Sequence, residues 1–466
     1  MQKVWEHVYS FLIIPLLWVL LHVLGLVNRK IRRGIQGRHG LFTTLEQHAR
    51  SLKPGKRVWF HSSSMGEFEQ AKPIIAELKR RFPGVRIIVT FFSPSGFEHS
   101  KKYHLADMIA YLPFDTKANA RRFMDVIRPD VAVMVRYDVW PNHIWELRRR
   151  GIPILIANAT MRRQTPRRLP MSRAFHHHVY DAITKILTVS QSDAEAFRMF
   201  RLNRPTIEVI GETRYDQVYV RSAEAKKHHI IPDHILRGKL VFVVGSSWPE
   251  DEEVILPTFL KLAECFDNLM LILVPHEPTV EHLETLEEEL SGKTSCIRFS
   301  ALNEYRGEHV ILVDSVGILL TLYAYAHVAY VGGSFKQGVH NTLEAAAFGI
   351  PVLFGPRHRN SQEPLQLIDQ GGAFVLNDSQ ELYRTARNLF EDESARTQTG
   401  ERAARFVHSN RGATERFLHH LQPYLNETDH LGKKLKAGRK DLPLPKVRRT
   451  PSEDAYGKRH QGTKLS

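Results

Sequence analysis

Cysteine is almost absent from the 466-residue chain, which contains only Cys265 and Cys296. Two cysteines cannot build a disulfide framework or a cysteine-based zinc or iron–sulfur site. The GxxxxGK[ST] and GxGxxG phosphate-binding patterns are missing, which argues against ATP-binding and NAD-binding folds of those types. The HExxH metal motif is missing as well.

The composition is that of a globular protein. A hydrophobic fraction of 42% and a charged fraction of 25% exclude a wholly disordered chain, a collagen-like fibre and a polytopic transporter. At roughly 150 residues per domain, the length predicts two or three domains.

The net charge of +15 is concentrated in two short segments. Residues 28–38 contain five Lys or Arg and no acid, and residues 431–466 contain eleven Lys or Arg against three acids. The first 27 residues are neutral, so residues 39–430 carry only +2. A basic excess is typical of proteins that bind nucleic acid, an anionic membrane or an anionic substrate. Because the excess lies in two short segments, it indicates where the protein is located in the cell rather than what its folded domains do.

The first basic segment follows a long apolar run, VYSFLIIPLLWVLLHVLGLV, at residues 8–27. Twenty residues of helix just span a hydrocarbon core of about 30 Å, and the run is too long for a usual signal peptide. The basic flank predicts that the rest of the chain stays in the cytoplasm. Pro15 and His22 weaken the span, so a tilted or interfacial helix and a buried core helix are the alternatives.

The C-terminal segment 431–466 is rich in Lys, Arg, Pro and Gly and is predicted to be disordered. It is either a solvated extension or a contact for a membrane surface or nucleic acid. No aromatic residues are interleaved with its basic residues as in a nucleic-acid groove, so no nucleic-acid partner is expected.

Between these segments, short apolar runs with β propensity alternate with amphipathic helical stretches. This pattern predicts parallel strands covered on both faces. The runs form two series, separated near residues 215–238: 57–63, 85–92, 108–114, 131–137, 153–159, 185–190 and 206–211, then 239–247, 269–275, 309–315, 328–334, 351–356 and 373–377. We therefore predict an α/β fold with two doubly wound Rossmann-like domains facing an interdomain cleft.

Four segments follow from this division. They are a membrane anchor with its basic flank (1–38), an N-terminal Rossmann-like domain (39–220), a C-terminal Rossmann-like domain (221–430) and the basic tail (431–466). In such sheets, ligands bind beyond the carboxyl ends of the strands, which here line one cleft between the two domains.

Two acidic residues follow predicted strands of the first domain. Glu67 closes the motif HSSSMGE (61–67), and Asp138 lies in RYDVWPN (136–142). The small residues before Glu67 let a substrate approach the backbone. Glu67 is a candidate catalytic base, although a carboxylate in a first helical turn is also a common stabilising choice. Asp138 could reach the same cleft or cap the following helix.

Two Gly-containing turns follow strands of the second domain. GSSWPEDEE (245–253) offers a phosphate-sized turn around Ser246. In VGGSFKQGVHNTLEAAAFGIPVLFGP (331–356), Glu344 lies in the first turn of a helix, where it could accept hydrogen bonds from both ribose hydroxyls or act only as a helix-capping acid. The run His176–His178 lacks the spacing of a metal site and is interpreted as a solvated basic face.

Taken together, these motifs resemble the Kdo transferases (Kdo, 3-deoxy-D-manno-octulosonic acid) of Gram-negative bacteria. The resemblance covers most of residues 8–425, and its carriers include SSMGE, YDVWPN, GETRYD, GSSWPEDEE, VPHEP, VDSVG and the 331–356 string. It implies inverting glycosyltransferases of the two-Rossmann-domain (GT-B) type, in which the N-terminal domain (39–220) lies on the acceptor side and the C-terminal domain (221–430) binds the nucleotide sugar. Such enzymes move Kdo from CMP-Kdo to the lipid A precursor lipid IVA at the cytoplasmic face of the inner membrane, without a metal or another cofactor.

The resemblance also assigns roles to residues. The family's catalytic base falls on Glu67, and a second acid falls on Asp138, where the family usually has Glu. The positions expected to contact CMP are Pro275, His276, Val316, Gly317, Ile318, Asn341, Thr342, Leu343 and Glu344. Many relatives read Pro-Arg-His where this chain reads Pro275-His276-Glu277. The missing Arg must be replaced, for example by helix N-termini or Arg214.

The sequence therefore predicts a membrane-anchored glycosyltransferase whose partners are CMP-Kdo, lipid IVA and inner-membrane lipids. A GT-B transferase that uses a UDP-sugar on a lipid acceptor is the alternative enzyme. A non-catalytic, membrane-associated binding protein of the same fold is the alternative outside catalysis, and a nucleic-acid binder driven by the tail is a third class.

Overall fold

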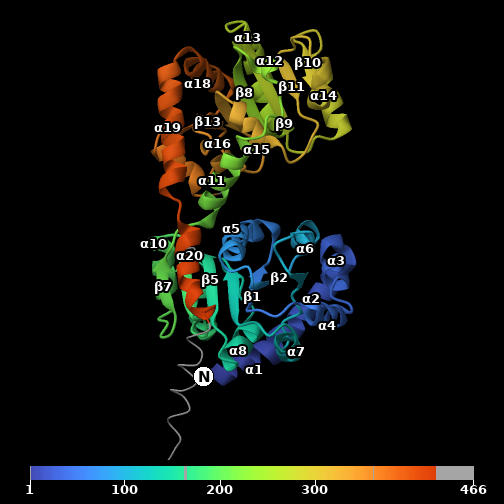
Figure 1. The fold of residues 1–466 in the computed structure, drawn as a ribbon, viewed down its shortest axis with the longest axis vertical. Helices are drawn as coiled ribbons and strands as arrows, with labels where there is room; N and C mark the ends of the chain where they lie inside the picture. The colour runs from blue at the N-terminus through green and yellow to red at the C-terminus, as the bar shows by residue number, and fades with distance from the viewer. Residues whose placement is uncertain (1, 162–164, 360, 427–466) are drawn as a thin grey trace, which may run out of the picture.

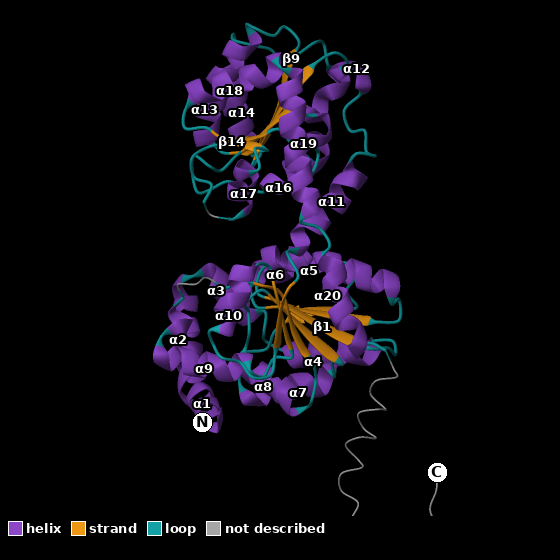
Figure 2. Cartoon of the chain, turned by 90° about the vertical axis from the view of Figure 1, so that its left-hand side faces the viewer, coloured by secondary structure: helices purple, strands orange, loops and turns teal. Residues whose placement is uncertain are grey.

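The computed structural model describes residues 2–161, 165–359 and 361–426. The chain forms two α/β lobes stacked end to end (Figure 1). Each lobe has a seven-stranded, fully parallel sheet covered by helices on both faces (Figure 2). The sequence predicts two such lobes, with seven strands in the first and six in the second. The basic tail predicted over 431–466 lies outside the described residues.

The first sheet has the strand order β3-β2-β1-β4-β5-β6-β7. Alternate residues of its central strands enter two separate cores, with Trp59 on one face and Val58 and Phe60 on the other. The strands are β1 (Arg57–Ser62), β2 (Arg86–Phe91), β3 (Met108–Tyr111), β4 (Val131–Val135), β5 (Ile154–Ala159), β6 (Lys185–Thr188) and β7 (Thr206–Val209). The helices are α4 (Leu41–Ser51), α5 (Met65–Arg81), α6 (Pro94–Ser100), α7 (Lys117–Ile127), α8 (Pro141–Arg149), α9 (Pro170–Tyr180) and α10 (Gln191–Arg198).

The second sheet has the order β10-β11-β9-β8-β12-β13-β14. Its strands are β8 (Leu240–Ser247), β9 (Leu269–Pro275), β10 (Cys296–Arg298), β11 (Val310–Leu312), β12 (Val328–Val331), β13 (Val352–Phe354) and β14 (Ala373–Val375). Its helices are α12 (Asp233–Leu236), α13 (Pro249–Ala263), α14 (Val280–Leu290), α15 (Leu319–Leu322), α16 (Thr342–Ala346), α17 (Glu363–Asp369), α18 (Ser379–Glu391) and α19 (Glu393–Ser409). The sequence did not predict the short edge strand β10.

Strand order reverses between β1 and β4 in the first sheet and between β8 and β12 in the second. At such a switch point, the helices that follow neighbouring strands leave to opposite faces of the sheet and open a crevice where ligands bind. The segments with candidate site residues, HSSSMGE, RYDVWPN, GSSWPEDEE and VGGS, follow these four strands. The fold thus brings them to the two switch points.

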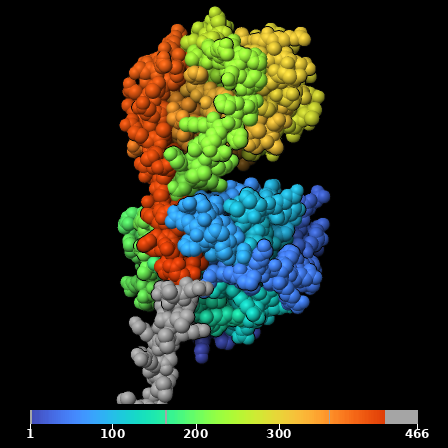
Figure 3. All heavy atoms as spheres, in the orientation of Figure 1, coloured from blue at the N-terminus to red at the C-terminus, as the bar shows by residue number. Residues whose placement is uncertain are grey.

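The chain crosses between the lobes twice, at the start of α11 (Thr213–Ala225) and before α20 (Ala413–Leu421). Thr213 is held in the first lobe by Asn158, and Tyr215 and Val218 enter the core of the second. The Asp216 carboxylate accepts from the amides of Gly412 and of Thr414. The two crossings are therefore tied together into one narrow connection, and Figure 3 shows an open groove between the lobes beside it.

The last helix, α20, packs on the first lobe rather than the second. Phe417, Leu418 and Leu421 are buried in the same core as Phe60 of β1. The sequence analysis assigned residues 221–430, and therefore α20, to the second domain. Its boundary at residue 220 falls inside α11. The C-terminal segment thus closes one face of the N-terminal sheet, next to α5 and β5 in Figure 1.

The N-terminal apolar run forms one continuous helix made of α1 (Gln2–Val8), a π-helical turn (Tyr9–Ile13) and α2 (Ile14–Val27). Pro15 has no amide hydrogen to donate, which accounts for the local widening: the amide of Ile14 bonds to the carbonyl of Tyr9 five residues back. The helix is long and apolar enough to cross a membrane. This is weak evidence for membrane association.

Only one side of this helix touches the body of the protein. Tyr9 and Ile14 are buried, and the Tyr9 hydroxyl donates to Asp115 at 2.9 Å. The opposite side is apolar and exposed, with Leu16 at 67% and Val27 at 84% exposure. The buried core helix that the sequence allowed as an alternative is therefore not what forms. Asn28 then caps the basic helix α3 (Arg29–Gln36).

Candidate active site

Glu67 lies in the first turn of α5, just beyond the carboxyl end of β1. Ser64 caps this helix, and its hydroxyl accepts from the amide of Glu67 at 3.4 Å. The Glu67 side chain is only 7% exposed, and its Oε2 accepts from the backbone amide of Ser63 at 2.6 Å. The stabilising role that the sequence allows for Glu67 is therefore present. It does not prevent a catalytic one, since the side chain stays beside the turn where a substrate would bind.

Asp138 follows β4 and faces the same turn from the other side of the switch point. Its Oδ2 accepts from His61 Nε2 at 2.8 Å, from the Ser63 hydroxyl, and from Trp140 Nε1 at 3.2 Å. Trp140, not Asp138, occupies the N-cap of α8, and it makes no side-chain cap bond. The helix-cap alternative for Asp138 is therefore wrong. Ser63 joins the two acids, since its amide binds Glu67 and its hydroxyl binds Asp138.

The surroundings of the two carboxyl groups shift their pKa values in opposite directions. Burial, and then the negative charge of Asp138, raise the pKa of Glu67 above its ordinary value. Burial alone would raise the pKa of Asp138. Hydrogen bonds from His61, Ser63 and Trp140, together with the electrostatic effect of His61, outweigh burial and lower the pKa of Asp138. A pair split in this way provides a base that holds a proton readily beside a carboxylate that stays ionised.

His61 is a site residue that the sequence reasoning did not assign, although it opens the HSSSMGE motif. It is fully buried, and its Nδ1 lies 2.9 Å from the Thr90 hydroxyl, which itself accepts from Trp59 Nε1 at 2.8 Å. The same Nδ1 lies 3.1 Å from the Thr90 backbone carbonyl, so the ring is held by Thr90 on one side and by Asp138 on the other. The sequence could have identified His61 from the alternation of side chains along β1, which puts His61 on the same face of the sheet as Trp59.

We expect replacement of Asp138 by Asn to lower kcat about tenfold, because a less basic Glu67 accepts a proton less readily. The substitution removes one negative charge that raises the pKa of Glu67. Since the base must be deprotonated to act, the acid limb of the kcat/KM profile should move to lower pH. Kinetics between pH 5 and 9 would measure both effects. The control is Asp125→Asn, at an exposed ion pair with Arg150; an acid limb that does not move would contradict the coupling.

At the second switch point, small residues let the ends of β8 and β12 approach closely. A Cβ added to Gly332 would lie 2.3 Å from the carbonyl oxygen of Ser246, so only glycine fits. Ser246 itself has a positive φ of 57°, at a shift in strand register between Gly245 and Ser247. This strained, closely packed turn is where the sequence places part of the donor site.

The turn around Ser246 is less open to phosphate than the sequence predicts. The buried Asp251 carboxylate accepts from the amides of Trp248 at 3.0 Å and of Gly333 at 2.7 Å. Two amides that a phosphate could otherwise meet are thus already satisfied within the protein. The first turn of α13 also carries Glu250 and Glu252, which disfavours a further anion there.

Three aromatic side chains from three different segments stack beside this turn. The His276 ring stacks with that of Trp248, with ring centroids 4.7 Å apart, and with that of His340, at 4.5 Å. Trp248 Nε1 also donates to His340 Nε2 at 3.0 Å. The sequence predicted only His276 of these three. The ammonium group of Lys336 lies 4.1 Å from the Trp248 ring centroid and 3.3 Å from Glu250 Oε1, which puts a cation next to the stack.

The predicted donor residues of the other loops gather around the same strand ends. Pro275 ends β9, and the next amide, of His276, bonds to the Ser247 carbonyl at 2.8 Å. Gly317 has a φ of 85°, and Ile318 precedes α15, whose Leu319 packs against Gly245. Val316 is 80% exposed and makes no part of the core.

Asn341 and Glu344 lie at the start of α16, at the groove between the lobes. Asn341 caps the helix by accepting from the Leu343 amide at 3.2 Å, and Thr342 and Leu343 are buried. Glu344 Oε1 lies 3.6 Å from Arg221 Nη1 on α11. Burial raises the pKa of Glu344, and the negative charge of Glu69 on α5 adds to the effect. The second-lobe carboxylate therefore lies within electrostatic range of the helix that carries Glu67.

Arg214, which the sequence offered as a replacement for the missing Arg, is already paired. Its guanidinium contacts the carboxylates of both Glu212 and Glu363. Two anionic partners leave it no net charge to offer a phosphate in this conformation. Of the cations considered, Lys336 lies closest to the aromatic stack.

No group of three or more His, Cys, Asp or Glu side chains is arranged to hold a metal ion within residues 2–161, 165–359 and 361–426. The run His176–His178 lies on α9 and is half-buried, with His177 Nδ1 2.9 Å from the Phe200 carbonyl. Burial lowers the pKa of His176 and of His178. The run is therefore less exposed and less basic than a solvated basic face would be.

Two doubly wound lobes, with acids at one switch point and an aromatic cluster at the other, form a GT-B-like architecture. This architecture recurs in UDP-N-acetylglucosamine 2-epimerase from Neisseria meningitidis bound to UDP-GlcNAc. That likeness has a TM-score of 0.54 at 14% identity and covers 78% of this chain and 99% of the other. At this identity it shows the fold alone.

Sequence relatives give the family. The family model for 3-deoxy-D-manno-octulosonic-acid transferases (kdotransferases) matches residues 33–217. The 3-deoxy-D-manno-octulosonic acid transferase of Aquifex aeolicus is 30% identical over 336 residues, 71% of this chain and 86% of the relative. That of Haemophilus influenzae is 27% identical over 431 residues, 90% of this chain and 99% of the relative. The chain belongs to the Kdo transferase family of glycosyltransferases.

Proposed function

We propose that this glycosyltransferase moves Kdo from CMP-Kdo to lipid IVA and inverts the anomeric configuration. The observation that carries the proposal is the pair Glu67 and Asp138, joined through Ser63 at the switch point of the first lobe. Family membership supports Kdo as the transferred sugar. Lipid IVA as acceptor and inversion rest on the resemblance of the motifs and on the chemistry below.

Inversion requires one in-line displacement. A base takes the proton of the acceptor hydroxyl while the hydroxyl oxygen bonds to the anomeric carbon of Kdo and the bond to the phosphate of CMP breaks. In this proposal Glu67 is that base, and the raised pKa that burial and Asp138 give its carboxyl group supports the role. Asp138 accepts a hydrogen bond from the Ser63 hydroxyl, and its negative charge raises the pKa of Glu67.

The donor side follows from the second lobe. In this proposal Trp248, His276 and His340 border the cytosine, the Glu344 carboxylate accepts from the ribose hydroxyls, and Ser246, Pro275, Val316, Gly317, Ile318, Asn341, Thr342 and Leu343 line the rest of the CMP site. Lys336 balances the phosphate charge in place of the missing Arg, since Lys336 is paired with one acid, Glu250, whereas Arg214 is held by two.

Replacing Lys336 by Met should raise KM for CMP-Kdo about tenfold and leave kcat within about twofold, because a lost phosphate contact weakens ground-state and transition-state binding alike. Initial rates at varied CMP-Kdo would measure it. The matched control is Lys261→Met, a lysine that likewise lies over an aromatic ring, that of Tyr383, away from the switch point. An unchanged KM would show that Lys336 does not serve the donor.

We further propose that the protein works at the cytoplasmic face of the inner membrane, held by its single N-terminal helix. The exposed apolar side of α2 and the cations Arg29, Lys30 and Arg33 that follow it support this placement. An acceptor that is itself a membrane lipid is then delivered beside the first lobe.

Donor choice and stereochemistry test the proposal together. Purified protein would be incubated with lipid IVA and either CMP-Kdo or UDP-sugars, and the configuration of the product followed by 13C NMR with labelled sugar. We expect transfer from CMP-Kdo alone, with the anomeric configuration opposite to that of the donor. Transfer only from a UDP-sugar would favour the alternative enzyme, and absence of any transfer would favour a non-catalytic binding protein.

A further inference from the structure

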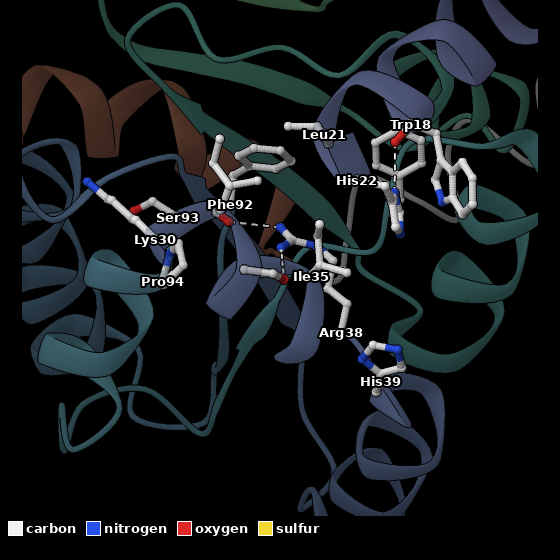
Figure 4. Close-up of a pocket in the computed structure, with 13 residues that line it drawn as sticks. Trp18, Leu21, His22, Lys30, Ile35, Arg38, His39, Phe92, Ser93 and Pro94 are labelled. Atoms are coloured by element: carbon white, nitrogen blue, oxygen red, sulfur yellow. Dashed lines mark hydrogen bonds between the residues drawn. The ribbon is translucent and has the colours of Figure 1, made fainter. Parts of the chain in front are cut away.

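A cavity of about 440 Å³ lies between the N-terminal helix and the first lobe (Figure 4). Its volume falls within the roughly 300–1,000 Å³ typical of small-ligand sites. Apolar and aromatic side chains from α2, α3, the loop after β2 and the segment after β3 form most of its wall, together with a few cationic ones. They include Trp18, Leu21, Ile31, Ile35, Phe92 and Phe114, with Lys30 and Arg38 as the cations.

Arg38 gives this cavity an anion-attracting side. Its guanidinium donates to the carbonyls of Leu112 at 2.9 Å, Phe92 at 2.8 Å and Gly34 at 2.6 Å, and lies over the rings of Phe92 and Tyr111. Among the described residues it has no carboxylate within ion-pairing distance. Burial lowers the pKa of Arg38 to about 10, so it stays charged at neutral pH. A cation balanced only by carbonyl dipoles is suited to an anionic ligand.

The cavity wall is continuous with the candidate catalytic turns. The Phe92 ring stacks on Trp140 with centroids 4.4 Å apart, and Trp140 donates to Asp138. The amide of Ser93 donates to the Ser63 carbonyl at 2.9 Å. The segment 92–93 thus borders the cavity on one side and both acid-bearing turns on the other. A ligand in the cavity would contact the same segment, 92–93, that contacts both acid-bearing turns.

The other wall is the helix that faces the membrane. Leu21 lines the cavity, while its neighbour Leu20 is 49% exposed on the apolar outer side. The exposed Lys30 stands at the start of α3, also on the cavity wall. The cavity therefore lies between a lipid-facing helix and the segment that contacts the catalytic turns, and it has a cationic side. This arrangement suits a lipid with acyl chains and an anionic headgroup.

We propose that this cavity holds one acyl chain of the lipid acceptor, with Lys30 and Arg38 facing the anionic headgroup. The proposal rests on the proposed function and deepens it, since it names where the acceptor's chain binds. Burying the chain holds the headgroup hydroxyl beside Glu67, and part of the binding energy of the lipid is thereby used to position the reacting atom.

The test compares two tryptophan substitutions on the same helix. Leu21→Trp fills the cavity, and Leu20→Trp makes the same change on the outer side. With CMP-Kdo as donor, each is assayed on lipid IVA and on its fully deacylated bisphosphorylated disaccharide. We expect Leu21→Trp to lower kcat/KM for lipid IVA about tenfold through KM, and to leave the deacylated acceptor unchanged. Leu20→Trp should match the wild type on both.

Equal losses on both acceptors, or equal effects of the two variants, would overturn the proposal. A second measurement does not depend on transfer or on the folding of a variant. Wild-type protein in detergent micelles is cross-linked with lipid IVA carrying a diazirine on one acyl chain, and with phosphatidylglycerol carrying the same group. We expect the lipid IVA probe to label the peptides of Phe92 and Phe114, and unlabelled lipid IVA to prevent it.

Labelling there by phosphatidylglycerol that lipid IVA does not displace would assign the cavity to a membrane lipid and overturn the proposal, as would absence of labelling at these peptides. Failure of the proposed function looks different: the wild type would transfer Kdo to neither acceptor.

Discussion

Glu67→Gln should reduce kcat for Kdo transfer by about 10²–10⁴-fold, the usual contribution of a general base, with little change in KM for CMP-Kdo. The substitution is close to isosteric, and the amide oxygen can still accept from the Ser63 amide, so the turn should keep its shape. What it removes is the ability to take a proton from the acceptor hydroxyl. Steady-state kinetics with both substrates varied would separate the two parameters.

The matched control is Glu77→Gln, on the same helix α5 but ion-paired with Arg80 and Arg81 on the surface. It should keep wild-type activity. Loss of less than half of the activity in Glu67→Gln would rule out Glu67 as the base. In the wild type, the raised pKa of Glu67 should place the acid limb of kcat/KM above the ordinary pKa of glutamate, since the base works only when deprotonated.

Phe417→Ala should lower the free energy of unfolding of the first lobe by about 3–5 kcal/mol, the range for large-to-small changes at a fully buried aromatic residue. Phe417 is 0% exposed and packs from α20 into the core that contains Phe60. Because α20 comes from the far end of the chain, the effect should fall on the N-terminal lobe. Urea unfolding, followed by fluorescence of the Trp59 and Trp145 that are buried there, would measure it.

Phe374→Ala is the control, because Phe374 on β14 is 37% exposed and its loss leaves no enclosed cavity. It should cost about 1 kcal/mol or less. Equal destabilisation by the two substitutions, or a loss confined to the second lobe, would contradict the packing of α20 on the first.

Much of this fold could be predicted because most of its strands are buried on both faces. Such strands appear as continuous apolar runs, and thirteen runs matched strands of the two sheets. The strand β10 was missed because Cys296, Ile297 and Arg298 form a short, half-buried edge with no apolar run. The docking of α20 was missed for another reason: an amphipathic helix shows which face is apolar, but not which of two domains will cover it.

The candidate site shows the same division between local and distant information. Glu67 and Asp138 could be singled out because each follows a strand directly. The link from His61 to Asp138 spans 77 residues, and that from Trp248 to His340 spans 92. No local pattern reports such contacts; they follow from strand order, which places β1 beside β4 and β8 beside β12. The pairing of Arg214 with Glu363 was hidden for the same reason.

Mass spectrometry of lipid IVA after incubation with CMP-Kdo, using wild-type protein and Glu67→Gln side by side, tests the central claim most directly. The wild type should convert lipid IVA to a product heavier by one or more Kdo residues, and Glu67→Gln should leave it unmodified over the same time. If folded wild-type protein left lipid IVA unmodified, the assignment as a Kdo transferase would be contradicted. Equal conversion by both proteins would contradict the assignment of Glu67 as the base.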